Sequence, residues 1–534
     1  MKKLKQIFAK KLTYITLVLI FAIFFVTKKV IYYSEDPVGE KDCPPLFPSE
    51  DDPAKQTRIE AKGLRISWSQ KGGSINDASC LDKTPVYGIV QVHTEEDIKN
   101  ALVFARDNSL KVSIAGVKHS MGGQAFYKNA IVLDMTKFNK MSLDEKSKIL
   151  TVETGATWHA IQNFLHPKYA VKAMQSTDIF SVGGSISVNA HGMDHNVGAL
   201  GKTIRSLRLM LPDGSIKRLS RTENSELFNL VIGGYGLFGV MLDAELEITD
   251  NVVYQSGRRI IDYKKFPEIF NKELINDKKL GLFYGHLSTA PQSFLKEMIL
   301  YTYENSGITD AHIPPLGEIS STKLRRFMIN LSKRGPLAMS LKWSAEKYIE
   351  PRLESCSISR NQAMKNGEAC LVARNEPMHD SVKYLKNNLK NDTDILHEYF
   401  IPRDRFVEFI DGMRRIMVDN DANLLNASIR VVHKEDNFLN YAPADAFSIV
   451  LYLNQTTDKA GNEKMHKFTS ELIDLTHRMG GKFFLPYQLY YTADQLKQSY
   501  PEIISFFAAK KKYDPNLVIT NTWYEKYSHE LRID

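Results

Sequence analysis

Residues 113–124 read "SIAGVKHSMGGQ" and join two apolar runs, "KVSIA" and "AIVLDM", that are each typical of a β-strand. Gly116, Gly122 and Gly123 leave room for the backbone to approach a ligand closely. Successive backbone N–H groups in such a turn form a concavity that suits an anionic group. An ordinary turn between two strands has a similar composition, so this stretch alone leaves a structural loop and a binding loop open.

Two further glycine-rich segments favour the binding loop. They are "QSTDIFSVGGSISVNAHG" at 175–192 and "IGGYGLFGV" at 232–240, and each lies beside a strand-like run. Three such turns within about 125 residues indicate a long ligand that lies against backbone at several points. The sequence has neither G-x-G-x-x-G opening a helix nor G-x-x-x-x-G-K-[ST], which argues against a Rossmann site and a P-loop.

The length and charge of the chain limit what surrounds this ligand. With 534 residues, 43% of them hydrophobic, the chain is expected to form at least two folded units. The net charge is +8, but seven lysines flank a single apolar run, at positions 2, 3, 5, 10, 11, 28 and 29. The rest of the chain is close to neutral, so no nucleic-acid partner is expected.

That apolar run, "LTYITLVLIFAIFFVT", has no charge over the 16 residues 12–27. As a helix it would be ~24 Å long, and it would cross a ~30 Å bilayer core if the flanking lysines reach the interface. A cleaved signal peptide and a buried helix are the alternatives. We favour a single-pass anchor over 12–28 after a tail of residues 1–11. Five lysines before the run and two after it predict a cytoplasmic N-terminus and a periplasmic or extracytoplasmic body.

The next segment is rich in proline and acidic residues and predicts a tether over 29–74. From about Ile75 strand-like and helical patterns alternate, and a helix is expected after the capping threonine of "TEEDIKNALVFARDNSL". Four cysteines, Cys43, Cys80, Cys356 and Cys370, lack C-x-x-C spacing, so no metal site is expected. They suit an oxidising compartment, with three pairings and free thiols all open.

Taken together, these motifs resemble the FAD-binding domain of the vanillyl-alcohol oxidase type (PCMH-type) flavoproteins. The resemblance rests on "NDAS", "IAGVKHSMGGQ", "IVLDM", "VETGATW", "SVGGSISVNAHG", "LPDGS", "LFNLVIGGYGLFGV" and "DPNLVITNTWYEKY". The segments "HEYFIPRDRF" and "NASIRVVHKEDNFLNYAPADAFSIVLYL" resemble the substrate domain of the sugar-lactone and alditol oxidase branch. The resemblance implies an α+β chain: a two-lobed FAD-binding domain over 75–250, an α+β substrate domain over 251–513, and a segment 514–534 that returns to the FAD domain.

The resemblance also implies which residues contact FAD. They are Ala115, Gly116, Val117, Lys118, His119, Ser120, Gly122, Gly123, Gln124, Ser181, Gly183, Gly184, Ser187, His191, Gly192, Gly236, Gly239, Val240 and Asn521. His119 matches a histidine that in many members is bonded covalently to the 8α-methyl carbon of the flavin, and an imidazole nitrogen is a suitable nucleophile for that bond. A histidine that only hydrogen-bonds within the loop is the alternative. His191 either acts in catalysis or shapes its turn.

On the substrate side, Arg430 in "SIR" matches an arginine that lies over the flavin in alditol and lactone oxidases; an ion-paired arginine is the alternative. Relatives commonly carry an acidic residue where this chain has Ser428. Residues 480–491, "GGKFFLPYQLYY", also depart from the usual motifs. Tyr487 and Gln488 are therefore candidate catalytic hydrogen-bond donors, or packed core. The usual general base has no counterpart in these motifs.

The implied function is oxidation of a hydroxyl group on a sugar, alditol or sugar lactone by hydride transfer to flavin N5. Oxygen, a quinone or a cytochrome would then take the electrons. The alternatives are oxidation of a lipid-linked sugar, reduction of a sterol-type double bond, and a flavin-binding partner protein without catalysis.

Overall fold

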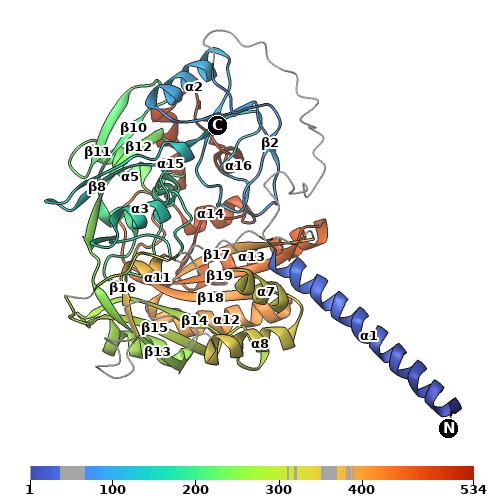
Figure 1. The fold of residues 1–534 in the computed structure, drawn as a ribbon. Helices are drawn as coiled ribbons and strands as arrows, with labels where there is room; N and C mark the ends of the chain where they lie inside the picture. Colours follow the sequence, from blue (N-terminus) through green and yellow to red (C-terminus); the bar gives the residue numbers. More distant parts are fainter. Residues whose placement is uncertain are drawn as a thin grey trace.

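The computed structural model describes residues 2–35, 66–309, 312–317, 322–349, 370–379, 387, 389 and 391–533. Over these residues the chain is a mixed helix and sheet protein, as expected from the sequence. Three main sheets form the body, and one long N-terminal helix extends away from it (Figure 1).

The first sheet holds the segment quoted at the outset. Its strand order is β1-β4-β6-β5, with bounds Gln70–Lys71, Gly88–Gln91, Ile131–Asp134 and Val112–Ala115. Strands β4, β6 and β5 are parallel, so "KVSIA" and "AIVLDM" are neighbouring strands and the glycine loop lies between them in sequence. A short pair, β2 (Ser74–Ile75) and β3 (Thr84–Pro85), precedes them.

Helix α2 (Glu95–Asp107) crosses between β4 and β5 and begins where the sequence predicts. The Thr94 hydroxyl accepts a hydrogen bond from the Asp97 N–H, and the Asp97 carboxylate accepts one from the Thr94 N–H at 2.8 Å. This capping box satisfies two N–H groups that a helix start leaves unpaired. The apolar face of α2, including Ile98 and Leu102, is buried against the sheet.

The second sheet has the order β11-β10-β12-β8-β7, and β9 also pairs with β12. Its strands are β7 Met141–Asp144, β8 Ile149–Glu153, β9 Tyr169–Val171, β10 Ile204–Met210, β11 Ile216–Ser220 and β12 Val240–Asp250. Helices α3 (Trp158–Leu165), α4 (Val182–Ser187) and α5 (Ser225–Val231) belong to the same part of the chain.

The third sheet has eight strands in the order β16-β13-β15-β14-β18-β19-β17-β20. The bounds are β13 Val253–Asp262, β14 Leu280–Leu287, β15 Glu297–Asn305, β16 Cys370–Ala373, β17 Asp392–Pro402, β18 Asn423–Val432, β19 Ala446–Thr456 and β20 Lys482–Phe483. Helices α12 (Phe406–Asp419) and α13 (Lys459–Arg478) pack together and against β17 and β19. Further helices are α6 Phe266–Ile269, α7 Thr322–Ser332, α8 Pro336–Tyr348, α11 Asn375–Met378 and α14 Ala493–Ser499.

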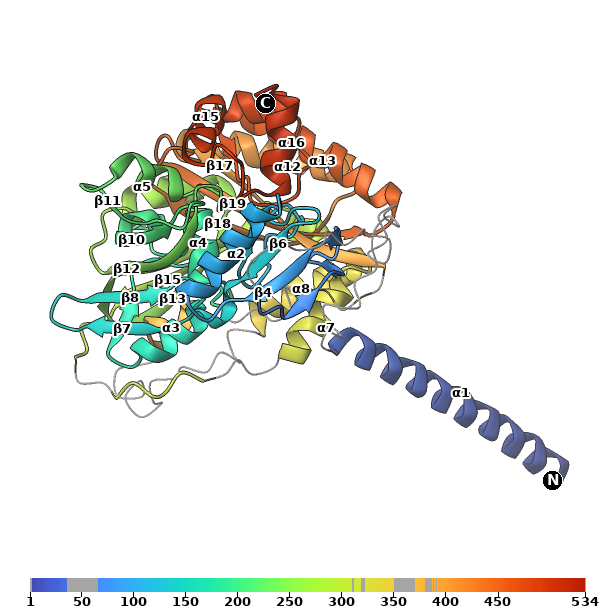
Figure 2. The ribbon, with the colours of Figure 1, turned by 90° about the horizontal axis from the view of Figure 1, so that it is seen from above.

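The C-terminal helices α15 (Ile503–Tyr513) and α16 (Thr522–Glu530) lie beside the first two sheets (Figures 1 and 2). Between them the chain runs alongside β5: Val112 N–H donates to Val518 O at 2.7 Å, and Thr520 N–H donates to Val112 O at 2.9 Å. Asn521 donates to Tyr235 O at 2.9 Å. The end of the chain therefore packs beside the first and third glycine-rich segments.

Helix α1 (Lys2–Ser34) contains the apolar run and continues past residue 28, where the anchor was expected to end. Among the described residues, it is the single helix long and apolar enough to cross a membrane, with a candidate span of Thr13–Ser34 that is not buried in the body. Its C-terminal end contacts α7, where Asn330 donates to Tyr33 O at 2.8 Å.

The tether after α1 ends earlier than expected from the sequence. The tether was expected to reach residue 74, but β1 already pairs with β4, and Trp68 packs on Tyr87 and Phe104 with ring centroids 5.6 Å apart in both cases. The folded body thus includes residues 66–74.

Cys80 and Cys370 each take part in a disulfide bond, so neither is a free thiol. Cys43 and Cys356 lie outside the described residues, so the predicted pairings stay open.

Candidate active site

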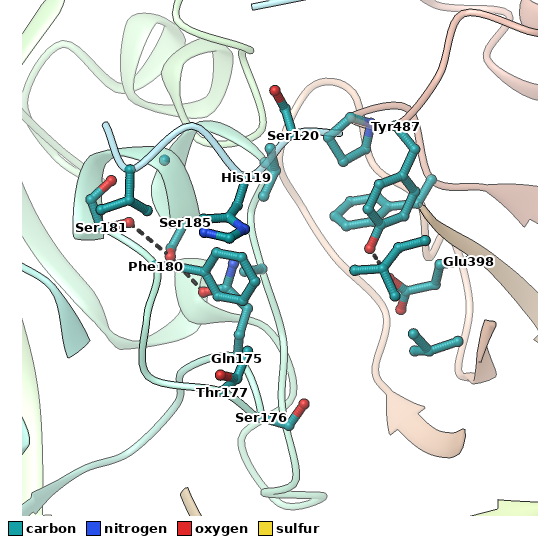
Figure 3. A pocket seen from close by; sticks show the side chains of 18 of the residues that line it. His119, Ser120, Gln175, Ser176, Thr177, Phe180, Ser181, Ser185, Glu398 and Tyr487 are labelled. Carbon is teal, nitrogen blue, oxygen red and sulfur yellow. Dashed lines mark hydrogen bonds between the residues drawn. The ribbon is translucent and has the colours of Figure 1, made fainter. Parts of the chain in front are cut away.

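A cavity of about 860 Å³ lies where all three sheets meet. Its size falls within the range of ~300–1,000 Å³ typical of small-molecule and cofactor sites. One wall is built from the glycine-rich segments, and the opposite wall from the third sheet and the segment at 484–487. Figure 3 shows the two walls, with His119, Phe180 and Ser181 on one side and Glu398 and Tyr487 on the other.

The first glycine loop folds tightly against the second. A Cβ on Gly116 would come within 2.1 Å of the Ser181 hydroxyl oxygen, so the two segments approach each other at backbone distance. His119 lies between them and packs edge-on to Phe180, with ring centroids 5.7 Å apart (Figure 3). The imidazole therefore lines the cavity from a loop with little freedom to move.

Most of the residues expected to contact a cofactor line this cavity. They are Ala115, Gly116, Val117, Lys118, His119, Ser120, Gln124, Ser181, Gly183, Gly184, Ser187, His191, Gly236, Gly239 and Asn521.

Four of the expected residues are not in the cavity wall. Gly122 and Gly123 donate their N–H groups to the Asp77 carboxylate, each at 2.7 Å, so this "NDAS" aspartate fixes the loop from behind. Val240 is buried at the start of β12. Gly192 packs against the Met174 carbonyl. In the structure these residues shape the loops.

Gly192 supports a prediction about stability. A Cβ at this position would lie 1.9 Å from Met174 O, which is a backbone atom that cannot move aside by changing rotamer. We expect Gly192→Ala to lower the free energy of unfolding by ~1–3 kcal/mol or more. Thermal unfolding measures this, with Gly317→Ala as the control because nothing lies within 4 Å of its added Cβ. Equal melting temperatures for the two variants would contradict the packing described here.

The opposite wall is one face of the third sheet, where every second residue points into the cavity. The lining residues from its strands are Tyr284, His286, Tyr301, Leu396, Glu398, Asn426, Ser428, Arg430, Val450 and Tyr452. Ser428 and Glu398 are both paired with Val450, from its two sides, and so lie in one row of the sheet. A carboxylate, absent at position 428, therefore lies two strands away in the same row, at a spacing of ~10 Å.

Glu398 is the centre of a buried polar network. Its Oε1 accepts hydrogen bonds from His191 Nε2 and, at 2.6 Å, from the Ser448 hydroxyl. Its Oε2 faces the Tyr487 hydroxyl at 3.5 Å. Burial alone would raise the pKa of Glu398, but the charge and hydrogen bond of His191, the Ser448 hydroxyl and the charge of Arg430 together hold the pKa below its ordinary value. The carboxylate is thus ionised at neutral pH.

Arg430 lies on the same face of the sheet and is 9% exposed. Burial lowers its pKa, and the Glu398 charge works in the opposite direction. Among the described residues, its Nε and the Nδ1 of His191 have no hydrogen-bond partner. Buried donors and acceptors are normally paired, so unpaired ones that line a cavity are groups that a bound ligand can satisfy.

Of the two other proposed catalytic residues, Tyr487 and Gln488, one lines the cavity and the other does not. Tyr487 lines the cavity and faces Glu398. Gln488 does not line it: its side-chain amide donates to Met121 O, while Gln124 donates to Pro486 O. These two glutamines join the 486–488 segment to the first glycine loop. Tyr490 also turns away and donates to Asn462 at 2.6 Å.

Sequence reasoning missed Glu398, although it stands in the quoted "HEYFIPRDRF". A charged residue inside "DILHEYFI", which is otherwise the pattern of a buried strand, was the available signal. His397, its neighbour, points to the other side and lies near Phe468 of α13.

A cluster that could hold a metal ion was also not foreseen. His159 Nδ1 and His379 Nδ1 each lie 2.9 Å from the same Asp178 oxygen, and their ligand atoms lie within 4.8 Å of one another. Two imidazoles and a carboxylate are ligands that zinc accepts. The three residues come from separate segments, 159, 178 and 379, so no spacing in the sequence announces them.

The cavity fits FAD. Its glycine wall offers backbone and hydroxyl groups at close range, and its other wall offers aromatic rings. Its lining includes His191 Nδ1 and Arg430 Nε, buried atoms without a hydrogen-bond partner among the described residues. His119 would lie beside the cofactor, with Arg430 and Glu398 on the substrate side.

Comparison with known proteins agrees with this fit. Residues 86–220 match the family model described as FAD binding domain, and residues 340–527 match the one described as D-arabinono-1,4-lactone oxidase. An uncharacterized oxidoreductase of the fasciation locus of Rhodococcoides fascians is 31% identical over 32% of this chain and 39% of its own length. Decaprenylphosphoryl-beta-D-ribose oxidase of Mycolicibacterium smegmatis is 28% identical over 31% and 37%, and L-gulonolactone oxidase of Mus musculus 27% over 28% and 34%.

Each of these matches spans little more than a third of the relative's length. The two family models each cover part of the cavity wall, with the FAD-binding match before the lactone-oxidase match in the chain. Residues 86–220 therefore form an FAD-binding domain of the PCMH type, and the chain is similar to FAD-dependent oxidoreductases of the sugar-lactone oxidase branch.

Proposed function

We propose that this protein oxidises a hydroxyl group of a sugar, alditol or sugar-lactone type substrate, with FAD as the electron acceptor. The observation that carries the proposal is that the buried side chains of Glu398 and Arg430 both lie on the cavity face of the third sheet, opposite His119. FAD supplies the two-electron acceptor that such an oxidation needs.

Glu398 is the residue we propose for proton removal. The substrate hydroxyl must lose its proton as the carbon is oxidised, and the acceptor must lie within hydrogen-bond reach. Oε1 is held by His191 and Ser448, which leaves Oε2 facing the cavity near Tyr487. His191 and Ser448 position the carboxylate, and Tyr487 can orient the hydroxyl by a hydrogen bond.

Arg430 supplies positive charge on the same side. In a buried site a fixed charge acts strongly on negative charge that develops during the reaction, because little water screens it. Its Nε, which has no hydrogen-bond partner in the described part of the chain, can donate for that purpose.

We further propose that His119 holds FAD covalently. It lines the cavity on a tight loop, which keeps an imidazole nitrogen in one place relative to a bound ligand. Acid-precipitated parent protein is then expected to keep its flavin in the pellet, while His119→Ala releases all of it. His159→Ala is the matched control, since that histidine lies outside the cavity wall. Complete release of flavin from the parent would contradict the covalent bond and leave the fold unaffected.

We also propose that α1 is an uncleaved membrane anchor, with the N-terminus cytoplasmic and the body on the opposite side, as the lysine distribution suggests. A quinone or cytochrome in that membrane could then accept electrons, as could oxygen. The intact mass of the extracted protein tests the anchor, because signal cleavage would remove most of α1.

The activity is tested by product analysis. Purified, FAD-loaded protein is incubated with alditols, sugar lactones and glycosides, and the products are measured by mass spectrometry. A product lighter than its substrate by the mass of two hydrogens is expected for at least one compound. Absence of such a product for every compound would favour a flavin-binding partner protein instead.

A further inference from the structure

One end of the cavity is built by α7 and α8, which contain none of the three glycine-rich segments and none of the residues expected to contact FAD. The lining residues from these helices are Leu324, Arg325, Met328, Ile329, Lys342, Ala345, Glu346 and the adjoining Ile349. Their spacing places each set on one face of its helix. Apart from three charged residues the set is apolar, so this end of the cavity suits an apolar part of a ligand.

The same two helices expose large apolar side chains to the outside. Leu324, Leu337, Leu341, Tyr348 and Ile349 are between 53% and 76% exposed, and we call them the α7–α8 patch. Among the described residues outside α1, they are five of the ten exposed large hydrophobic side chains. The others are scattered singly over the surface, which is ordinary, whereas a cluster marks an interaction site.

Charge favours a membrane as the partner. Residues 322–348 carry seven basic residues and one acidic residue, Glu346. Arg326, Lys333 and Lys342 are buried, and Lys333 is paired with Asp394 at 2.6 Å. The basic residues at the surface are Lys323 and Arg334, which are exposed, and Arg325 and Lys347, which are partly exposed. Helices that combine exposed apolar residues with a basic flank are typical of segments that lie in the interface of anionic lipids.

The position of α1 places the α7–α8 patch at that interface. Tyr33, at the end of the candidate span, packs on Phe327 of α7 with ring centroids 6.3 Å apart, and Arg334 lies over the Tyr33 ring at 5.5 Å. Both ribbon views show α7 and α8 close to the end of α1 that joins the body (Figures 1 and 2). A bilayer crossed by α1 would therefore end beside α7.

We propose that the α7–α8 patch lies in the membrane surface, that the cavity opens there, and that the substrate is a lipid-linked sugar drawn from the membrane. Its apolar tail would leave between α7 and α8, and its hydroxyl-bearing head group would reach Glu398. Arg325, which lines this end, would meet an anionic linkage such as a phosphate. This substrate class rests on the proposed function, whereas the membrane contact does not.

Spin labels test the membrane contact without any catalysis. The full chain, with Leu341→Cys, is labelled without reductant and reconstituted in anionic phospholipid vesicles, with identically treated parent protein as background. The label at 341 is expected to be more accessible to oxygen than to a water-soluble nickel chelate. A label at Ile216→Cys, which is 44% exposed on β11 at the side of the body away from α1 (Figures 1 and 2), should show the reverse. If both labels are more accessible to the nickel chelate than to oxygen, the α7–α8 patch does not contact the membrane and the inference is wrong.

Flavin reduction tests the substrate class. Under anaerobic conditions, a prenyl-phosphate-linked pentose in vesicles is expected to reduce the flavin at least tenfold faster than the same pentose as a soluble glycoside. The double variant Leu337→Glu, Leu341→Glu should lose that advantage and leave the soluble reaction unchanged, while Phe164→Glu, Ile216→Glu, on α3 and β11, should keep it. Equal rates for both pentoses in the parent would overturn the lipid-linked substrate but not the proposed function. If neither pentose nor any other sugar reduces the flavin, the proposed function fails and the lipid-linked substrate with it, while the spin labels still decide the membrane contact.

Discussion

Glu398→Gln is expected to slow reduction of the flavin by substrate by a factor on the order of 10²–10⁴, which is the usual contribution of a positioned general base. Glutamine keeps the shape of the side chain and can still accept hydrogen bonds from His191 and Ser448, but it cannot take the substrate's proton. FAD content and melting temperature should change far less than the rate. Anaerobic stopped-flow absorbance of the bound flavin gives the rate directly.

Two control variants separate proton removal from packing. Glu435→Gln changes a carboxyl that is equally buried but does not line the cavity, so its rate should stay near that of the parent. Ser448→Ala removes a hydrogen bond that lowers the pKa of Glu398. Because the base must be ionised, the rate should fall as pH drops through that pKa, and in Ser448→Ala this fall should occur at a higher pH. A Glu398→Gln variant reduced as fast as the parent would exclude Glu398 as the base.

Arg430→Lys is expected to slow flavin reduction about a hundredfold, the effect typical of losing one preorganised donor in a buried site. Lysine keeps the positive charge but loses the planar guanidinium and its Nε donor, which has no partner among the described residues. The loss should appear in the reduction rate rather than in FAD binding, because Arg430 lies on the substrate wall.

Arg414→Lys is the matched control for this prediction. Arg414 is a partly buried arginine that donates to Phe294 O at 3.0 Å and to Leu295 O at 2.8 Å, away from the cavity. Its replacement should cost stability and leave the reduction rate close to that of the parent. If Arg430→Lys matches the parent in rate, the arginine is structural, and Tyr487 becomes the next residue to test.

Short sequence motifs were sufficient to predict the helix starts and loops whose structure depends on neighbouring residues. The capping residues Thr94 and Asp97 mark the start of α2, as expected from the sequence. The glycine loops were recognisable because close backbone approach requires glycine wherever it occurs, as at Gly116. Such features depend on neighbours in sequence, so a single chain reveals them.

Features that depend on which residues of distant strands are paired could not be predicted from the sequence. Our proposal that Glu398 takes the place of the acid missing at 428 rests on the pairing of both residues with Val450, and that pairing joins residues far apart in the chain. The His159, Asp178 and His379 cluster and the α7–α8 patch arise in the same way, from segments brought together by folding. Gly122 and Gln488 show the converse: each stands in a plausible motif, but its contacts turn inward, to Asp77 and to Met121.

The central claim is that the cavity between His119 and Glu398 binds FAD and brings an alcohol to it. The most direct measurement is anaerobic mixing of the FAD-loaded full chain with alditols, sugar lactones and lipid-linked sugars, followed by the visible absorption of the flavin. The account predicts that at least one of these compounds bleaches the flavin in the parent and that Glu398→Gln bleaches at least a hundredfold more slowly. Flavin that stays oxidised with every compound, yet is reduced at once by dithionite, would contradict it.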